Sequence, residues 1–373
     1  MTEIAAYNHD LLSSGHTMKQ RNNFDFLRLF AAALVVVGHG YALMGQTPPM
    51  IFYTPISTFG VIIFFSISGY LIAGSWEREP HALRFFAKRG LRLFPALIVV
   101  VLLSAFVLGP VETTYSIKAY FSDPLTYQYL RNIRLNINYF LPGVFASNPW
   151  PNAVNGSLWS LPVEFTSYMF VPVVALLAAR AQTVAFALLA ALLAAVSTYL
   201  DIFQATRQFT FYAMDIRSGT TVAAYFAAGA VIWHVRRVVP LNLVAAVVAI
   251  GVYIGLVQFT AGNARFPIAI ASAFLLPYII ITIGEAQKLR LPDAGKFGDF
   301  SYGLYLYAFP VEQAIAQHLH GKSGPLTTIT LAFAVSMPLA IASWHLIEKH
   351  ALALKPRARS MQPITSSPPQ SAT

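Results

Sequence analysis

Long apolar stretches recur along this sequence, and they constrain its fold more than any other feature. About ten of them approach the ~20 residues that an α-helix needs to cross a bilayer. They lie at residues 24–44, 56–75, 93–109, 159–179, 183–200, 219–235, 240–260, 266–284, 298–318 and 326–346. The sequence therefore predicts an all-α fold, a single polytopic bundle of helices in a membrane.

The composition favours a membrane protein over a soluble one. Hydrophobic residues make up 56% of the 373 residues and charged residues 11%, and the mean hydropathy is +0.58. Soluble domains usually carry about 25% charged residues, so this chain has too few to cover a surface that faces water. The sequence contains no cysteine, which excludes disulfides and thiolate chemistry.

The positions of lysine and arginine predict the orientation. If the N-terminus is cytoplasmic, most of the 25 Lys and Arg residues fall in inner loops, as the positive-inside rule requires. We therefore expect both termini in the cytoplasm, with tails at 1–22 and 353–373 around a membrane domain at 23–352. The second tail has the composition of a disordered end. Inner loops account for the net charge of +10, so no nucleic acid partner is implied.

The first apolar stretch carries three ionisable residues, Asp25, Arg28 and His39. Asp25 and Arg28 are three residues apart and can pair on one face of a helix near its inner end. His39 lies ~21 Å beyond Asp25 at 1.5 Å per residue, in the outer half of the bilayer. A neutral imidazole there can accept a proton from a hydroxyl, as a general base does. A histidine that serves only packing is the alternative.

Two further charged positions accompany this histidine. Glu164 lies a short way into a stretch that starts on the outer side, so we expect it at the depth of His39, where it can orient the ring. A basic cluster, Arg84, Lys88, Arg89 and Arg92, precedes the third stretch on the inner side. It is explained by orientation alone, but Arg89 and Arg92 share a helix face and can also clamp a phosphate.

Other features point to packing or to the membrane surface. Ser66, Ser68 and Gly69 are small residues in mid-membrane, where such residues permit close helix contact. The outer segment 110–158 is rich in aromatic residues, which fits either a binding surface or a belt at the lipid headgroups. We find no metal-ligand spacing, and two histidines at 318 and 320 are weak candidates for one.

Five segments of the sequence resemble the acyltransferase-3 family of integral membrane acyltransferases. "FDFLRLFAAALVVVGHG" is similar to its D-x-L-R start followed by a histidine, and "FGVIIFFSISGYLI" to its F-F-x-x-S-G-[FY]-L-I signature. "KRGLRLFPAL" matches its R-x-x-R-x-x-P element, and "GSLWSLPVEFTSYMFVP" its W-S-L-x-x-E-x-x-x-Y block. "FGDFSYGLYLYAFPV" follows its S-Y-x-x-Y-L-x-H-x-P pattern, with Ala308 in place of the histidine.

The resemblance implies transfer of an acyl group, often acetyl, from cytoplasmic acyl-CoA to a hydroxyl of a surface or exported carbohydrate or glycolipid. It implies a multi-pass protein of the cell inner membrane, with acyl-CoA as co-substrate and no permanently bound cofactor. His39 and Glu164 would be catalytic. The residues expected to bind donor or substrate are Arg89, Arg92, Asp25, Arg28, Ser68, Trp159 and Tyr302.

Several alternatives remain open at this point. In the mechanism we expect, the nucleotide end of the donor docks on the inner basic cluster and its pantetheine arm reaches towards His39. A covalent acyl-histidine relay is an alternative to direct transfer. A transporter or flippase of a sugar or lipid would need no acyl chemistry, and two matching halves with broken helices would favour it. A membrane sensor or scaffold, in which the charged residues within the membrane are only structural, is a third hypothesis for the function.

Overall fold

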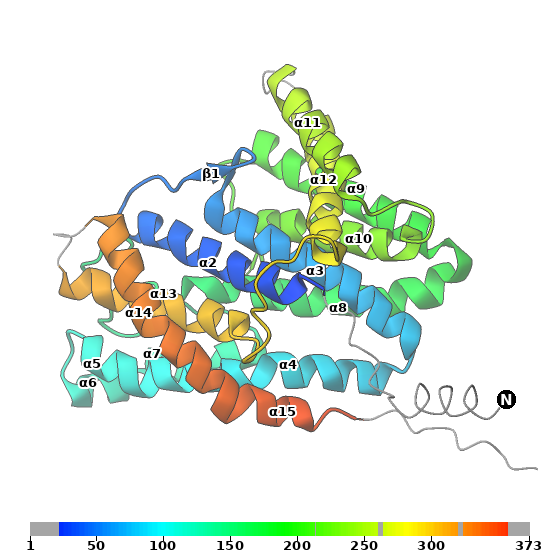
Figure 1. Ribbon diagram of the computed structural model, residues 1–373. Coiled ribbons are helices and arrows are strands. Elements are labelled where there is room, and N and C mark those ends of the chain that lie inside the picture. The colour runs from blue at the N-terminus through cyan, green and yellow to red at the C-terminus, as the bar shows by residue number, and fades with distance from the viewer. Residues whose placement is uncertain (1–21, 213, 260–263, 320–323, 357–373) are drawn as a thin grey trace, which may run out of the picture.

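The computed structural model describes residues 22–212, 214–259, 264–319 and 324–356, and helices dominate this part of the chain (Figure 1). Every one of the predicted apolar stretches forms a helix. The corresponding helices are α2 (Phe24–Leu43), α3 (Ile56–Arg78), α4 (Ala82–Leu103), α8 (Ser160–Ala178), α9 (Gln182–Phe203), α10 (Ile216–Val235), α11 (Leu243–Phe259), α12 (Arg265–Glu285), α13 (Ser301–His318) and α14 (Pro325–Ser343).

The all-α prediction is therefore confirmed. Strand pairing in the described residues consists of two short antiparallel hairpins and an isolated bridge between Thr113 and Val144. In one, β1 (Met50–Ile51) pairs with β2 (Thr54–Pro55), and in the other β3 (Thr210–Phe211) pairs with β4 (Met214–Asp215). Both hairpins sit in connections between long helices, so they shape loops and do not form a core.

Six helical segments of the described chain are long and apolar enough to cross a membrane, against about ten expected. One of them, 156–203, contains both α8 and α9, joined by a 3-10 turn at Ala179–Ala181. The helix α11 has only 17 residues, and α13 carries several polar side chains that other elements bury. Large apolar side chains such as Leu176, Leu188 and Val247 are exposed on the outside of the bundle, as expected for lipid contact. The protein is a membrane protein; the number of crossings and the side of each terminus stay predictions.

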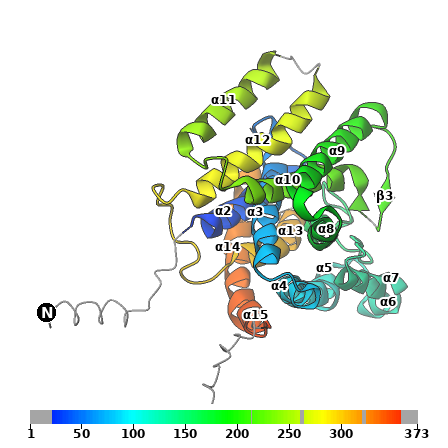
Figure 2. The ribbon, with the colours of Figure 1, turned by 90° about the vertical axis from the view of Figure 1, so that its right-hand side faces the viewer.

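The helices α11 and α12 are arranged differently from the rest. Figures 1 and 2 show them projecting from one side of the bundle, at a steep angle to α2, α3 and α4. The helix α12 packs on α9, α10 and α3, whereas α11 contacts mainly α12. The bundle that holds the polar residues is thus built without α11.

Close packing of α3 on α10 confirms the reading of the small residues in mid-membrane. A Cβ atom on Gly69 would lie 1.9 Å from the carbonyl oxygen of Phe226, and one on Gly229 would lie 2.3 Å from that of Ser66. Only glycine fits at such a backbone contact, so these two helices meet through glycine on both sides.

The segment 110–158, which the sequence predicts on the outer side, forms a folded cap and not an open loop. Its helical elements are α5 (Gly109–Glu112), α6 (Ile117–Ser122), α7 (Pro124–Gln128) and a 3-10 helix at Tyr129–Arg134. Tyr120 and Tyr129 are fully buried inside it, while Tyr127 and Phe140 are half exposed. Aromatic residues here therefore serve both packing and surface, and a residue count alone does not separate the two roles.

This cap is fastened to the C-terminal part of α13. The side chain of Asn148 donates to the carbonyl oxygen of Gln313 at 2.9 Å, and that of Gln313 donates to the carbonyl oxygens of Trp150 and Ala153. Asn155 donates to the carbonyl oxygen of Leu306, whose usual helical partner is missing because residue 310 is proline. The cap thus covers the end of the bundle where His39 lies.

The predicted tails fall almost wholly on residues 1–21 and 357–373, which lie outside the described residues. Lys349–Ala353 continues the last long helix as α15.

Candidate active site

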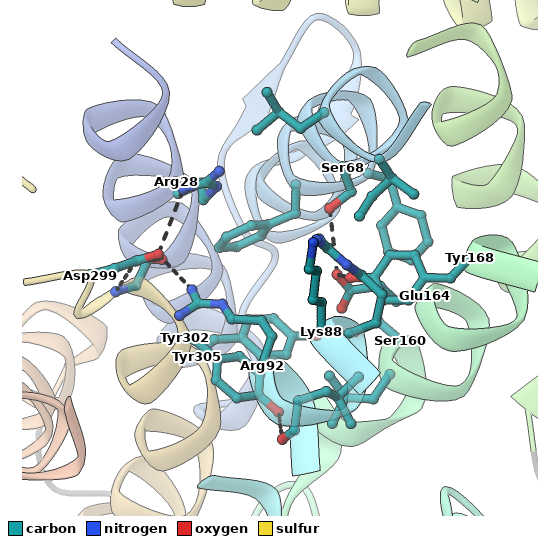
Figure 3. Close-up of a pocket in the computed structure, with 18 of the residues that line it drawn as sticks. Arg28, Ser68, Lys88, Arg92, Ser160, Glu164, Tyr168, Asp299, Tyr302 and Tyr305 are labelled. Atoms are coloured by element: carbon teal, nitrogen blue, oxygen red, sulfur yellow. Dashed lines mark hydrogen bonds and ion pairs between the residues drawn. The ribbon is translucent and has the colours of Figure 1, made fainter. Parts of the chain in front are cut away.

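A cavity of about 300 Å³ lies among α2, α3, α4, α8 and α13 and is also lined by Trp344, Leu352 and Lys355 (Figure 3). Its polar lining comprises Arg28, Ser68, Lys88, Arg89, Arg92, Ser160, Glu164, Tyr168, Asp299, Ser301, Tyr302, Tyr305 and Lys355. Segments far apart in the sequence therefore converge on one space, and five of the seven residues expected to bind donor or substrate line it: Arg28, Ser68, Arg89, Arg92 and Tyr302.

The two arginines of the predicted phosphate clamp have different surroundings. Arg92 donates to Asp299 at 2.6 Å, lies 3.6 Å from a carboxylate oxygen of Glu348 and stacks over the ring of Tyr302. Arg89 makes a long hydrogen bond of 3.5 Å to Ser75 and lies over the ring of Phe85. Its buried Nε atom has no hydrogen-bond partner in the described structure. Arg89 is therefore the cation that remains available to a ligand, whereas Arg92 is held by carboxylates.

Asp299 is the centre of this ionic network. Besides Arg92 it approaches Arg28 at 3.6 Å, and it accepts a hydrogen bond from the backbone N–H of Ser301. Burial opposes ionisation of Asp299, but Arg92 and Arg28 outweigh it and lower its pKa to about 2. The carboxylate thus joins α2, α4 and the start of α13.

The pair of Asp25 and Arg28 forms as the spacing predicts, with 2.8 Å between Oδ1 and Nη1. Arg28 lines the cavity, whereas Asp25 does not. Asp25 is therefore positioned to hold Arg28 and not to touch a ligand in the cavity.

Two cations complete the end of the cavity near α15. Lys88 is paired with Glu79 of the connection between α3 and α4. Lys355 lies beyond the last helix, and burial, together with the charges of Arg89 and Arg92, lowers its pKa. Positive charges that destabilise one another in this way mark a place where an anion would be stabilised.

Glu164 is not where the sequence placed it. Its Oε1 accepts a hydrogen bond from Ser68 at 3.4 Å and a second, short one from Tyr168. A Cβ atom on Gly38 would lie 2.5 Å from that of Ser57, so Ser57 marks the level of His39. Ser68 follows Ser57 on α3 by ~16 Å at 1.5 Å per residue. Glu164 thus lies with the arginines, and its expected contact with His39 is not formed.

His39 itself lies on α2 beneath the cap and does not line the cavity. The residue is partly exposed, and its buried Nδ1 atom has no hydrogen-bond partner in the described structure. The ring meets the ring of Phe309 edge to face, with centroids 5.0 Å apart. Helix α13 carries both Phe309 and the cavity-lining Tyr305, so it connects the two places.

Of the remaining predicted residues, one lines the cavity and one does not. Tyr302 lines the cavity and donates to the carbonyl oxygen of Leu93 at 2.8 Å. Trp159 ends the 3-10 turn before α8 and packs against the hydrophobic core without reaching the cavity. Ala308, which replaces the histidine of the resembled motif, packs in a small cluster with Ala32 and Val36 of α2.

Sequence reasoning missed Asp299, Glu348, Lys355 and Tyr305. It also missed Glu312, which is fully buried on α13 with neither carboxylate oxygen hydrogen-bonded in the described structure. The rule that ionisable residues within spans mark function would have selected Glu312. Asp299 stands directly before the Ser-Tyr pair of the late motif, which is a weaker signal.

Comparison with known proteins decides the class. A family model described as an acyltransferase domain matches residues 21–345. The chain belongs to this acyltransferase family. The resemblance of the five segments is thereby confirmed.

This acyltransferase is similar to two curated proteins along nearly its whole length. It is 31% identical over 346 residues to a protein named O-acetyl transferase of Shigella phage Sf6, covering 90% of this chain and 97% of that one. It is 29% identical over 361 residues to Nodulation protein 10 of Rhizobium leguminosarum bv. viciae, covering 92% and 96%. No solved structure matches the chain.

Proposed function

We propose that this acyltransferase transfers an acetyl group from acetyl-CoA to a hydroxyl of a carbohydrate or glycolipid, in the cell inner membrane and with both termini cytoplasmic. Family membership supports acyl transfer, and the phage relative's name supports an O-acetyl group. The observation that carries the proposal is the cavity, which is cationic at one end and is lined by α13, the helix that also contacts His39.

The cationic end fits the anionic part of the donor. Arg89 has donors that no protein group occupies fully, and Lys355 and Lys88 flank it around the cavity. Paired donors of a guanidinium bind phosphate oxygens more specifically than an ammonium does. We assign Arg89 to the phosphates of acetyl-CoA, with the lysines adding charge, and Arg92 to positioning.

The cavity volume fits part of the donor. About 300 Å³ is at the lower limit for ligand pockets, which suits the narrow pantetheine arm and leaves the nucleotide outside, over Lys88 and Lys355. In the described residues both hydrogen bonds of the Glu164 carboxyl end on Oε1. Its Oε2 is then left to accept a hydrogen bond from an amide N–H of that arm. Glu164 thus becomes a donor-binding residue in our proposal.

The proposed chemistry is transfer of the acetyl group at His39. The imidazole accepts the proton of the acceptor hydroxyl as the oxygen attacks the thioester carbonyl. The C–O bond forms and the C–S bond breaks, and the imidazolium returns its proton to the leaving thiolate. The products are an acetyl ester and free CoA. An acyl-histidine intermediate would give the same products in two steps.

The test is His39→Ala in membranes that contain the acceptor. We expect acetyl transfer from labelled acetyl-CoA to fall at least 100-fold, with the amount of inserted protein unchanged. Free CoA can be followed by thiol titration, because the protein has no cysteine of its own. A fully active His39→Ala protein would remove this residue from the mechanism, and a wild-type protein that leaves acetyl-CoA intact would refute the proposed function.

A further inference from the structure

Two aromatic side chains on α13 separate the cavity from His39. Tyr305 lines the cavity. Phe309 follows it by one helical turn, ~6 Å along the axis, and contacts the ring of His39. An acyl group that reacts at His39 therefore lies next to these two rings.

Tyr305 lines the cavity on the side nearer to His39 and is held in place. Its hydroxyl shares a hydrogen bond of 2.6 Å with Ser160 and donates another of 2.7 Å to the carbonyl oxygen of Ser157. Its ring meets that of Phe64 edge to face, with centroids 5.8 Å apart. The ring is thus fixed between the start of α8 and α3, and Ser160 and Phe64 line the cavity with it.

Phe309 fills the space beyond. It is buried in a small cluster with Leu43 and Ala153 of the outer cap region. A Cβ atom on Gly156 would lie 2.5 Å from the edge of its ring, so the ring occupies the room that glycine leaves. The hydrogen bond from Asn155 to the carbonyl oxygen of Leu306 fixes this part of the cap to α13. Little free volume remains next to Phe309.

Resting on the proposed function, we propose that Phe309 and Tyr305 determine which acyl group the enzyme transfers, by limiting the space for the acyl chain beside His39 to about two carbons. Protein interiors are close-packed, and each added methylene in a filled site costs free energy. An acetyl group is small enough to leave both rings in place. A butyryl group has to displace Phe309 from its contact with Gly156.

The experiment compares acetyl-CoA and butyryl-CoA as donors for the full-length protein in membranes that contain the acceptor. A hydrophobic pocket can change the relative rates of two substrates by about 10- to 200-fold for each methylene by which they differ. We expect Phe309→Ala to raise the ratio of butyryl to acetyl transfer at least 10-fold, and Phe309→Leu and Tyr305→Phe to raise it less. Gly156→Ala narrows the space at Phe309 and should lower the ratio.

The matched control is Phe186→Ala, which also removes a buried phenyl ring but on α9, against His234. It should lower thermal stability and leave the donor ratio unchanged. Size-exclusion chromatography in detergent selects the variants that are folded, and Phe309→Leu or Tyr305→Phe carries the test if Phe309→Ala is not among them. An unchanged ratio in the folded variants, while the wild type transfers acetyl, would overturn this inference and leave the proposed function intact.

Discussion

Two arginines at this site have different roles, and the groups that each one contacts determine its role. Arg89 and Arg92 share a helix face, as their spacing predicts, yet Arg92 is paired with two carboxylates and Arg89 with none in the described structure. The spacing reveals the shared face. It does not reveal the partners, because Asp299 is 207 positions away from Arg92 and reaches it only through the packing of α13 on α4.

We expect lysine substitutions to separate these two roles. Arg89→Lys keeps the positive charge but loses the paired N–H donors of the guanidinium. The KM for acetyl-CoA should therefore rise about 10-fold, with little change in thermal stability. Arg92→Lys breaks a partly buried network and should lower the melting temperature, with a smaller effect on KM. Steady-state kinetics and thermal unfolding in detergent measure both. A larger KM effect at Arg92 than at Arg89 would contradict the assignment.

The position of Glu164 shows the limit of counting residues from a helix end. The count assumes that α8 begins at the membrane surface. Ser160, its first residue, is already buried and bonds to Tyr305 of α13, because the outer cap covers the start of the helix. Glu164 therefore lies deeper than its number suggests. The helices themselves were predictable from hydropathy, whereas the cap is held by amide hydrogen bonds that hydropathy does not register.

At the scale of elements, α13 organises the site. Its first turn holds the ionic network, its middle lines the cavity, and its outer half contacts His39 and the cap. Its polar side chains lower its hydropathy below that of a typical span, yet they are the groups that fasten it. The same residues that weaken the membrane signal of α13 therefore fasten it to the cap and line the cavity.

The network at the start of α13 predicts a pH-independent contribution to stability. The pKa of Asp299 is about 2, below its usual 3.8. Its contribution is therefore complete above pH 3.8 and is lost only as the pH falls through 2. Asp299→Asn should destabilise the protein by about 3 kcal/mol.

In a Glu348→Gln background, which removes the second titratable carboxyl group next to Arg92, the loss of melting temperature caused by Asp299→Asn should thus be the same at pH 5, 6.5 and 8. The exposed Asp293 of the same connection provides the control, and Asp293→Asn should leave the melting temperature unchanged. A loss that varies between pH 5 and pH 8 would mean that Asp299 is not ionised throughout this range.

For the whole molecule, the distribution of lysine and arginine predicts ten crossings and cytoplasmic termini, and the structure identifies where that prediction is weakest. The helix α11 is 17 residues long, or ~26 Å, against a hydrocarbon core of about 30 Å. Both ribbon views show α11 and α12 inclined to the bundle. If this pair does not cross, the protein has eight crossings and the orientation of every other helix is unchanged.

Single cysteines settle this topology directly, because the natural chain contains none. Suitable exposed positions are Ala82 and Val238 on the predicted inner side and Ala119 on the outer side. Phe259, at the end of α11, is 92% exposed. Its side of the membrane distinguishes a topology of ten crossings from one of eight. We expect a membrane-impermeant maleimide to label Ala119→Cys and Phe259→Cys in intact cells, and Ala82→Cys and Val238→Cys only after permeabilisation. Protection of Phe259→Cys in intact cells would reduce the count to eight, and labelling of Ala82→Cys from outside would invert the orientation on which the cytoplasmic donor site depends.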